Sequence, residues 1–273
     1  MENTNDRNEF SRALVVVAHA DDAEYGCSGT VAKLCDQKYE VVYVLCTNGS
    51  KGAGDREITQ EKLVDIRRTE QIAAGNVLGL KNVVFLDYDD SYLQPTLDLR
   101  RDIARQIRVY RPDVVICQHP MRNLEGFWGV GHPDHIAAGE ATLSAVFPTA
   151  RDHLTFPELL NSGLEPHNVS EIWIMGHPIP DFWVDVTEYI DVSVRAIMQH
   201  KSQIEGRSYE YMNDRMRDWR RQQAVGKGMQ YAEAFKRIDF QSYTMLMDSQ
   251  ASYISPSSDF FYSSNFRNTR QAF

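Results

Sequence analysis

The chain of 273 residues is 42% hydrophobic and 25% charged, an ordinary globular composition with room for one large α/β domain or two small ones. Its formal net charge of −9 at pH 7 argues against non-specific electrostatic binding to nucleic acid or to an anionic membrane. No apolar run approaches the about 20 residues of a membrane span, the polar segment 1–8 has no signal-peptide core, and the four cysteines lack disulfide-framework spacing. We therefore expect a cytoplasmic protein that binds neither nucleic acid nor membrane.

The first half of the chain alternates short apolar runs with longer amphipathic stretches. The apolar runs predict buried strands over 13–18, 41–46, 83–86 and 113–117. The stretches between and after them predict helices over about 30–37, 59–78, 97–108 and 136–146. This spacing predicts βαβ units with right-handed crossovers, and therefore an α/β protein with a mostly parallel central sheet flanked by helices.

Past residue 147 the alternation loosens. The segment 147–167 carries three prolines and predicts an insertion with a short helix over 156–162. Two more apolar runs predict strands over 171–175 and 181–186. A helix is expected over 187–204, with Thr187 as its N-cap.

The chain ends in two segments of weaker pattern. The basic and aromatic segment 207–221 also carries acidic residues, which favours a solvated helix or a subunit contact over an RNA-binding surface. Residues 241–273 have no clear period and predict a tail that packs on the surface or on a neighbouring subunit of a homo-oligomer. We accordingly divide the chain into a flexible N-terminal arm (1–12), an α/β domain (13–240) and this C-terminal tail.

A first polar cluster follows the strand at 13–18. It holds His19, Asp21, Asp22 and Glu24, ahead of a glycine-containing turn. Ligands of open α/β sheets bind at the carboxyl ends of strands, so one imidazole and three carboxylates at that point suggest a metal ion. The alternatives are a plain helix cap or a dinucleotide-binding turn, but the acidic side chains would crowd a pyrophosphate.

A second polar cluster, with His132, Asp134 and His135, follows the strand at 113–117. If the two strands are neighbours, the clusters combine into a possible metal-binding set of two imidazoles and one carboxylate. Such a set suits a catalytic zinc ion, which keeps three protein ligands and an open position, although ferrous iron can share these ligands. Zinc lowers the pKa of the water it binds to about 7, and a nearby carboxylate can take the proton.

These clusters belong to a longer series of motifs in which the sequence resembles the PIG-L/LmbE family of zinc-dependent deacetylases. The resemblance runs from about residue 13 to 240. Members remove an acetyl group from N-acetylglucosamine-type conjugates on a Rossmann-like fold. The motifs are His-x-Asp-Asp-x-Glu (19–24), Thr-Asn-Gly-Ser-Lys-Gly (47–52), Arg-Pro-Asp-Val-Val (111–115), His-Pro-Asp-His (132–135), His-Lys-Ser-Gln (200–203) and Tyr-Ala-Glu-Ala-Phe (231–235).

The resemblance implies a role for each residue of the two clusters. The zinc ligands would be His19, Asp22 and His135, and Asp21 would be the general base. His132 would stabilise the oxyanion or protonate the leaving amine, oriented by Asp134. The sequence departs from the family pattern at Ala20, where a proline is common, and it lacks the tyrosine that some members place shortly before His-Pro-Asp-His.

The sequence therefore predicts metal-dependent hydrolysis of an N-acyl amide, expected to be an N-acetyl group, on a small-molecule amino-sugar conjugate. Two alternatives stay open: an amidase acting on a thiol-sugar conjugate, and a non-catalytic sugar- or nucleotide-binding protein on the same fold. The candidate substrate-binding residues are Arg67, Arg68, Trp128 and His177. For each of them a solvated, packed or purely structural side chain is at least as common a role.

Overall fold

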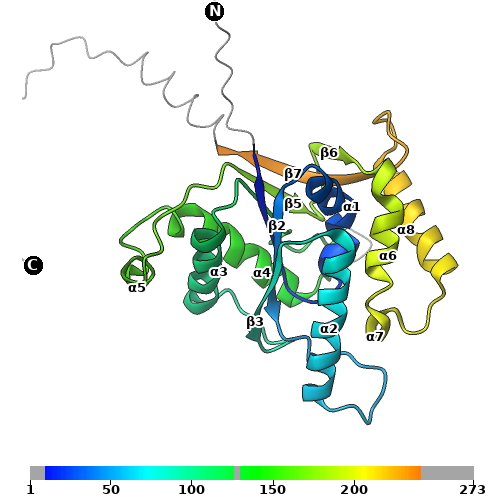
Figure 1. Cartoon of the computed structure of the whole chain (residues 1–273), viewed down its shortest axis with the longest axis horizontal. Coiled ribbons are helices and arrows are strands. Elements are labelled where there is room, and N and C mark those ends of the chain that lie inside the picture. Colours follow the sequence, from blue (N-terminus) through cyan, green and yellow to red (C-terminus); the bar gives the residue numbers. More distant parts are fainter. Residues whose placement is uncertain (1–9, 126–129, 241–273) are drawn as a thin grey trace, which may run out of the picture. The chain divides into compact units, whose positions relative to one another are not determined.

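A seven-stranded sheet forms the centre of the protein (Figure 1). The computed structural model describes residues 10–125 and 130–240. The strand order is β3-β2-β1-β4-β5-β7-β6; β1 to β5 run parallel, and β7 is antiparallel to both β5 and β6. The strands are β1 (Arg12–Val17), β2 (Glu40–Thr47), β3 (Asn82–Tyr88), β4 (Val114–Gln118), β5 (Glu171–Met175), β6 (Phe182–Asp185) and β7 (Ala232–Asp239). The predicted α/β fold with a mostly parallel sheet is confirmed.

Helices cover both faces of the sheet. Figure 1 shows α1, α2, α6 and α8 on one side and α3 and α4 on the other. The α-helices are α1 (Asp22–Asp36), α2 (Gln60–Leu78), α3 (Leu97–Tyr110), α4 (Pro133–Ser144), α5 (Pro157–Asn161), α6 (Ile190–Ile197), α7 (Lys201–Ile204) and α8 (Tyr209–Gln223). A π-helical turn, η1 (Ala145–Thr149), follows α4, and a 3-10 turn, η2 (Thr187–Tyr189), precedes α6.

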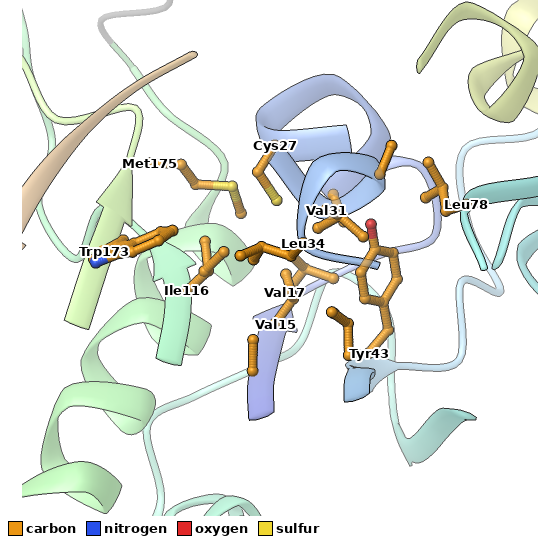
Figure 2. Packing of buried hydrophobic residues seen from close by; sticks show 14 of the residues in the cluster. Val15, Val17, Cys27, Val31, Leu34, Tyr43, Leu78, Ile116, Trp173 and Met175 are labelled. Carbon is orange, nitrogen blue, oxygen red and sulfur yellow. The ribbon is translucent and has the colours of Figure 1, made fainter. Parts of the chain in front are cut away.

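The continuous apolar runs of the sequence are explained by burial on both faces. In β1 the side chains of residues 14–17 are all 0% exposed. Val15 and Val17 face the cluster that includes Cys27 and Val31 of α1 (Figure 2), and the alternation of a strand turns Leu14 to the opposite face. A two-sided core of this kind is typical of parallel sheets.

Three local predictions were wrong. Helix α1 begins at Asp22 rather than near residue 30, and it is interrupted at Cys27, whose φ is −153°. The expected helix over 187–204 is broken into η2, α6 and α7, and Thr187 does not cap α6 but donates its hydroxyl to Asp185 Oδ1. Strand β7 was missed because alanine and glutamate are poor strand formers and the buried Glu233 hides the apolar alternation.

Helix α8 confirms that the segment 207–221 contains a helix, but one of its faces is not solvated. Met212, Met216 and Arg220 are each 0% exposed. The two methionines pack with Val194 and Ile197 of α6. One face of this helix therefore packs against α6.

Some predictions concern residues that the structure does not describe. Trp128 and the segments 1–9 and 241–273 lie outside the described residues. The boundaries of the arm and the tail therefore stay predictions. Within 10–125 and 130–240, no helix is both long enough and apolar enough to cross a bilayer.

Candidate metal centre

The two polar clusters meet between β1 and β4, where the order of the strands in the sheet reverses. From β1 the chain continues to β2 on one side, while β4 lies on the other side and is paired with β1 in parallel. Connections leaving the carboxyl ends of two such strands diverge and open a crevice between them. The turn at His19 follows β1, and His132 lies at the start of α4, after β4. The condition that the sequence left open, that the two strands are neighbours, is fulfilled.

His19, Asp22 and His135 form a close triangle of possible metal donors. His19 Nδ1 lies 3.3 Å from His135 Nε2. The carboxylate of Asp22 lies 3.0 Å from His135 Nε2 through Oδ1 and 3.4 Å from His19 Nδ1 through Oδ2. Tetrahedral zinc with ligand bonds of about 2.0–2.2 Å separates its donor atoms by about 3.3–3.6 Å. These pairwise separations are of the size that a shared metal ion requires, although Asp22 faces the two imidazoles with different oxygens, and the donor types suit zinc or ferrous iron.

The other ring nitrogen of His19 faces two carboxylates. His19 Nε2 lies 3.0 Å from Asp134 Oδ2 and 3.3 Å from Asp90 Oδ1. Burial alone would lower the pKa of His19, but Asp134, Asp22 and Asp90 outweigh it and raise this pKa to about 12. With a proton on Nε2 for the carboxylates, the lone pair of Nδ1 is left for a metal, as in carboxylate–histidine–metal arrangements. A metal cation beside Nδ1 would replace the proton that this nitrogen carries in the doubly protonated imidazolium.

Backbone amides hold these two carboxylates in place. Asp134 accepts from the N–H of Ser91 at 2.7 Å and from that of Leu93 at 3.3 Å. Asp90 accepts from the N–H of Lys51 at 2.9 Å. These contacts suit Asp90 and Asp134 to orient His19, and together with His19 they also form a group of three side chains whose ligand atoms lie within 4.8 Å of one another. The resemblance implied that Asp134 orients His132; the Asp134 carboxylate faces His19, and it is the Asp134 backbone N–H that contacts His132.

His132 caps helix α4 and stands beside the donor triangle. Its Nδ1 accepts from the backbone N–H of Asp134 at 3.2 Å, so the neutral imidazole carries its proton on Nε2. The ring is exposed, and ring nitrogens of His19, His132 and His135 lie within 4.8 Å of one another. Partial burial and the neighbouring His19 and His135 lower the pKa of His132. At neutral pH the side chain can therefore donate through Nε2 without being charged.

Asp21 occupies a strained turn directly before α1. Its φ of 77° and ψ of −20° place it in the left-handed region, which is uncommon for a residue with a side chain. Burial and the neighbouring Asp22 carboxylate raise its pKa to about 7. A carboxylate with a pKa near neutrality is suited to general-base chemistry.

The candidate substrate-binding residues differ in position. Arg67 is buried, donates to Gly49 O at 2.7 Å, and lies 3.6 Å from Asp90, so it joins the centre through that carboxylate. Arg68 instead pairs with Asp87 and lies over the ring of Phe85. His177 follows β5 and packs edge-on against His119, which follows β4, with ring centroids 4.7 Å apart.

The sequence did not single out Asp90 as part of the centre. The segment 87–90 contains three aspartates. Composition could not show which of them turns inward, because this depends on the tertiary pairing of Asp90 with His19 and Lys51 N. Glu24 of the first polar cluster is fully buried, and its carboxylate contacts Gln71 and His200.

Replacing Asp90 is expected to weaken metal binding without removing a ligand. Asp90→Asn keeps the shape but loses the charge that favours the Nε2–H form of His19, and such indirect partners are worth about 10–100-fold in metal affinity. Competition with a chromophoric chelator measures this affinity. Asp87→Asn is the matched control, since Asp87 lies in the same loop but pairs with the half-exposed Arg68. Equal affinities of the two variants would contradict the role given to Asp90.

Comparisons with known proteins agree with the geometry. A family model described as PIG-L, GlcNAc-PI de-N-acetylase, matches residues 14–146, a span that contains both polar clusters. The chain is 31% identical over 231 residues to the diacetylchitobiose deacetylase of Thermococcus kodakarensis, covering 85% of this chain and 84% of that protein. It is 29% identical over 199 residues to a probable N-acetyl-alpha-D-glucosaminyl L-malate deacetylase 2 of Bacillus anthracis, covering 70% and 80%.

The solved structures include a similar fold. The N,N'-diacetylchitobiose deacetylase from Pyrococcus horikoshii matches with a TM-score of 0.79 at 27% identity, over 94% of this chain and 91% of that one. The extent of the sequence match to the Thermococcus protein, together with the family model, settles the classification. This chain belongs to the PIG-L/LmbE family.

Proposed function

We propose that this protein is a divalent-metal-dependent hydrolase that removes the acetyl group from an N-acetylated amino-sugar conjugate. The observation that carries the proposal is the donor triangle of His19, Asp22 and His135, with separations of 3.0–3.4 Å, at the crevice between β1 and β4. Relatives described as deacetylases of diacetylchitobiose and of N-acetylglucosaminyl malate support this substrate class. We propose zinc as the metal because nitrogen and carboxylate donors in a three-residue set are typical of catalytic zinc.

In the proposed mechanism His19, Asp22 and His135 hold the metal. When bound, the ion supplies Lewis acidity, which polarises the amide carbonyl and makes a water more acidic. Asp21 accepts a proton from the attacking water, a role that suits its raised pKa of about 7. His132 Nε2–H donates a hydrogen bond to the developing oxyanion or assists the departing amine. Asp134 and Asp90 keep His19 in the tautomer that leaves Nδ1 free.

The proposal is tested by metal analysis together with an assay of released acetate. Protein prepared without chelators is expected to hold one divalent ion per chain and to release acetate from a member of a panel of N-acetylated amino sugars and their conjugates. Chelation should abolish the release, and added Zn²⁺ or Fe²⁺ should restore it. Sugar binding without acetate release by the metal-loaded protein would favour the non-catalytic alternative, and a preparation without any bound ion would contradict the enzyme proposal.

A further inference from the structure

The turn that carries Asp21 is held by side chains from several different elements. Ala18 N donates to Gln118 of β4 at 2.9 Å, and Ala18 O accepts from the Thr47 hydroxyl of β2 at 2.9 Å. His19 N donates to Asp22 Oδ2 at 2.7 Å. A strained backbone conformation persists only where the surrounding structure fixes it in this way.

The peptide group between Ala20 and Asp21 is bonded on both sides. Gln203 of α7 donates its amide Nε2 to Ala20 O at 2.8 Å. Gln71 of α2 accepts from Asp21 N through Oε1 at 3.4 Å. Ala20 O and Asp21 N belong to one rigid peptide plane. Rotation of that plane changes ψ of Ala20 and φ of Asp21 together. The two glutamines therefore act on the dihedral angle that is unusual here, the positive φ of Asp21.

Gln71 is held by a charged, buried partner, and so is Ser202, the residue before Gln203. Gln71 is 0% exposed and donates Nε2 to Glu24 Oε1 at 3.0 Å. Helix α7 lies beside α2 (Figure 1), and Glu70 of α2 accepts from both N and Oγ of Ser202, at 2.8 and 2.6 Å. The residue next to Ser202 is Gln203, so this contact fixes the position from which its amide reaches Ala20.

We propose that Gln203 and Gln71 are positioning residues for Asp21, which hold the 20–21 peptide group in the orientation that directs the Asp21 carboxylate at the water. The proposal rests on the proposed function, because it takes Asp21 to be the base. It gives a reason for the segment 200–203, which lies far along the chain from both polar clusters. Neither glutamine belongs to the donor triangle, so their loss should affect the rate rather than the metal.

The variants that test this are Gln203→Met and Gln71→Met, which keep the length of the side chain and remove its hydrogen bonds. Gln199→Met is the matched control, since Gln199 lies just past the end of α6 and its amide donates to Arg195 O of that helix at 3.1 Å. We expect kcat to fall about 10–100-fold in the first two variants because of the displaced base. KM should stay within about twofold, and each should retain one metal ion. The control should match the unsubstituted protein.

Combination with Asp21→Asn separates positioning from a general structural role. In that background Gln203→Met should cause no further loss of the residual rate, because the group that it positions no longer acts as a base. A crystal structure of Gln203→Met should show the 20–21 peptide rotated and φ of Asp21 changed. Since Gln203 is only half-buried, this variant carries the test if Gln71→Met does not fold.

Two results would overturn the inference. One is a kcat of Gln203→Met equal to that of Gln199→Met; the other is a full multiplicative loss when Gln203→Met is added to Asp21→Asn. The failure of the proposed function is a different result. If Asp21→Asn alone keeps most of the activity, Asp21 is not the base, whatever the glutamine variants do.

Discussion

Asp21→Asn is expected to abolish acetate release while the metal stays bound. An asparagine has the same shape but cannot accept the proton of the attacking water, and loss of a general base typically costs about 10²–10⁴ in rate. The backbone N–H of residue 21 can still donate to Gln71, so the turn should keep its geometry. Steady-state kinetics with metal analysis of the same sample measures both properties.

Replacing the neighbouring Asp22 is expected to have a different effect from replacing Asp21. Asp22 contacts both His135 Nε2 and His19 Nδ1, so Asp22→Asn should weaken metal binding and lose activity for that reason, with recovery at raised metal concentration. Asp21→Asn is thus expected to keep the metal without turnover, and Asp22→Asn is expected to lose the metal. If both variants lose metal equally, the division of roles between Asp21 and Asp22 is wrong.

The sequence could predict the parts of the fold that depend on local pattern. Continuous apolar runs mark β1, β2, β4 and β5, because these strands are buried on both faces of the sheet; the run of the edge strand β3 is only partly buried. The same patterns locate the two polar clusters at strand ends, where topology brings them together. The start of α1 was missed because Gly26 and Gly29 suggested a turn. Gly29 is instead required by packing, since an added Cβ would lie 2.8 Å from Cβ of Val186.

The supporting groups could not be predicted, since they depend on contacts between distant segments. Asp90 approaches His19 across 71 residues, and Gln203 approaches Ala20 across 183. A glutamine or an aspartate in a helix or loop carries no local sign that it faces inward. The residue pattern therefore predicts that the two polar clusters meet, and it predicts poorly which groups from other segments contact them.

The buried ion pair between Arg220 and Glu233 is another contact between distant segments that the sequence could not predict, and this one concerns the stability of the fold. Both side chains are 0% exposed, and Arg220 Nε donates to Glu233 Oε1 at 2.9 Å. Glu233 also accepts from the N–H groups of Gly29 and Thr30, at 3.0 and 2.7 Å. These amides lie just after the break of α1 at Cys27, where the interrupted helix leaves donors without partners in the helix itself. The pair therefore joins α8 and β7 to α1, the helix that follows the turn of the first polar cluster.

Arg220→Met is expected to lower the free energy of unfolding by about 3–5 kcal/mol, because it leaves the Glu233 carboxylate buried without its counter-charge. For a chain of this size that corresponds to a fall in melting temperature of about 6–20 °C. The matched control is Arg221→Met on the same helix, whose exposed pair with Asp218 is worth about 0–1 kcal/mol. Chemical denaturation of the metal-free proteins measures both, so that differences in metal binding do not enter. Equal losses in the two variants would show that the carboxylate is sufficiently stabilised by the amides of α1 alone. The larger loss in Arg220→Met would instead show that α8 and β7 stabilise the element that carries Asp22.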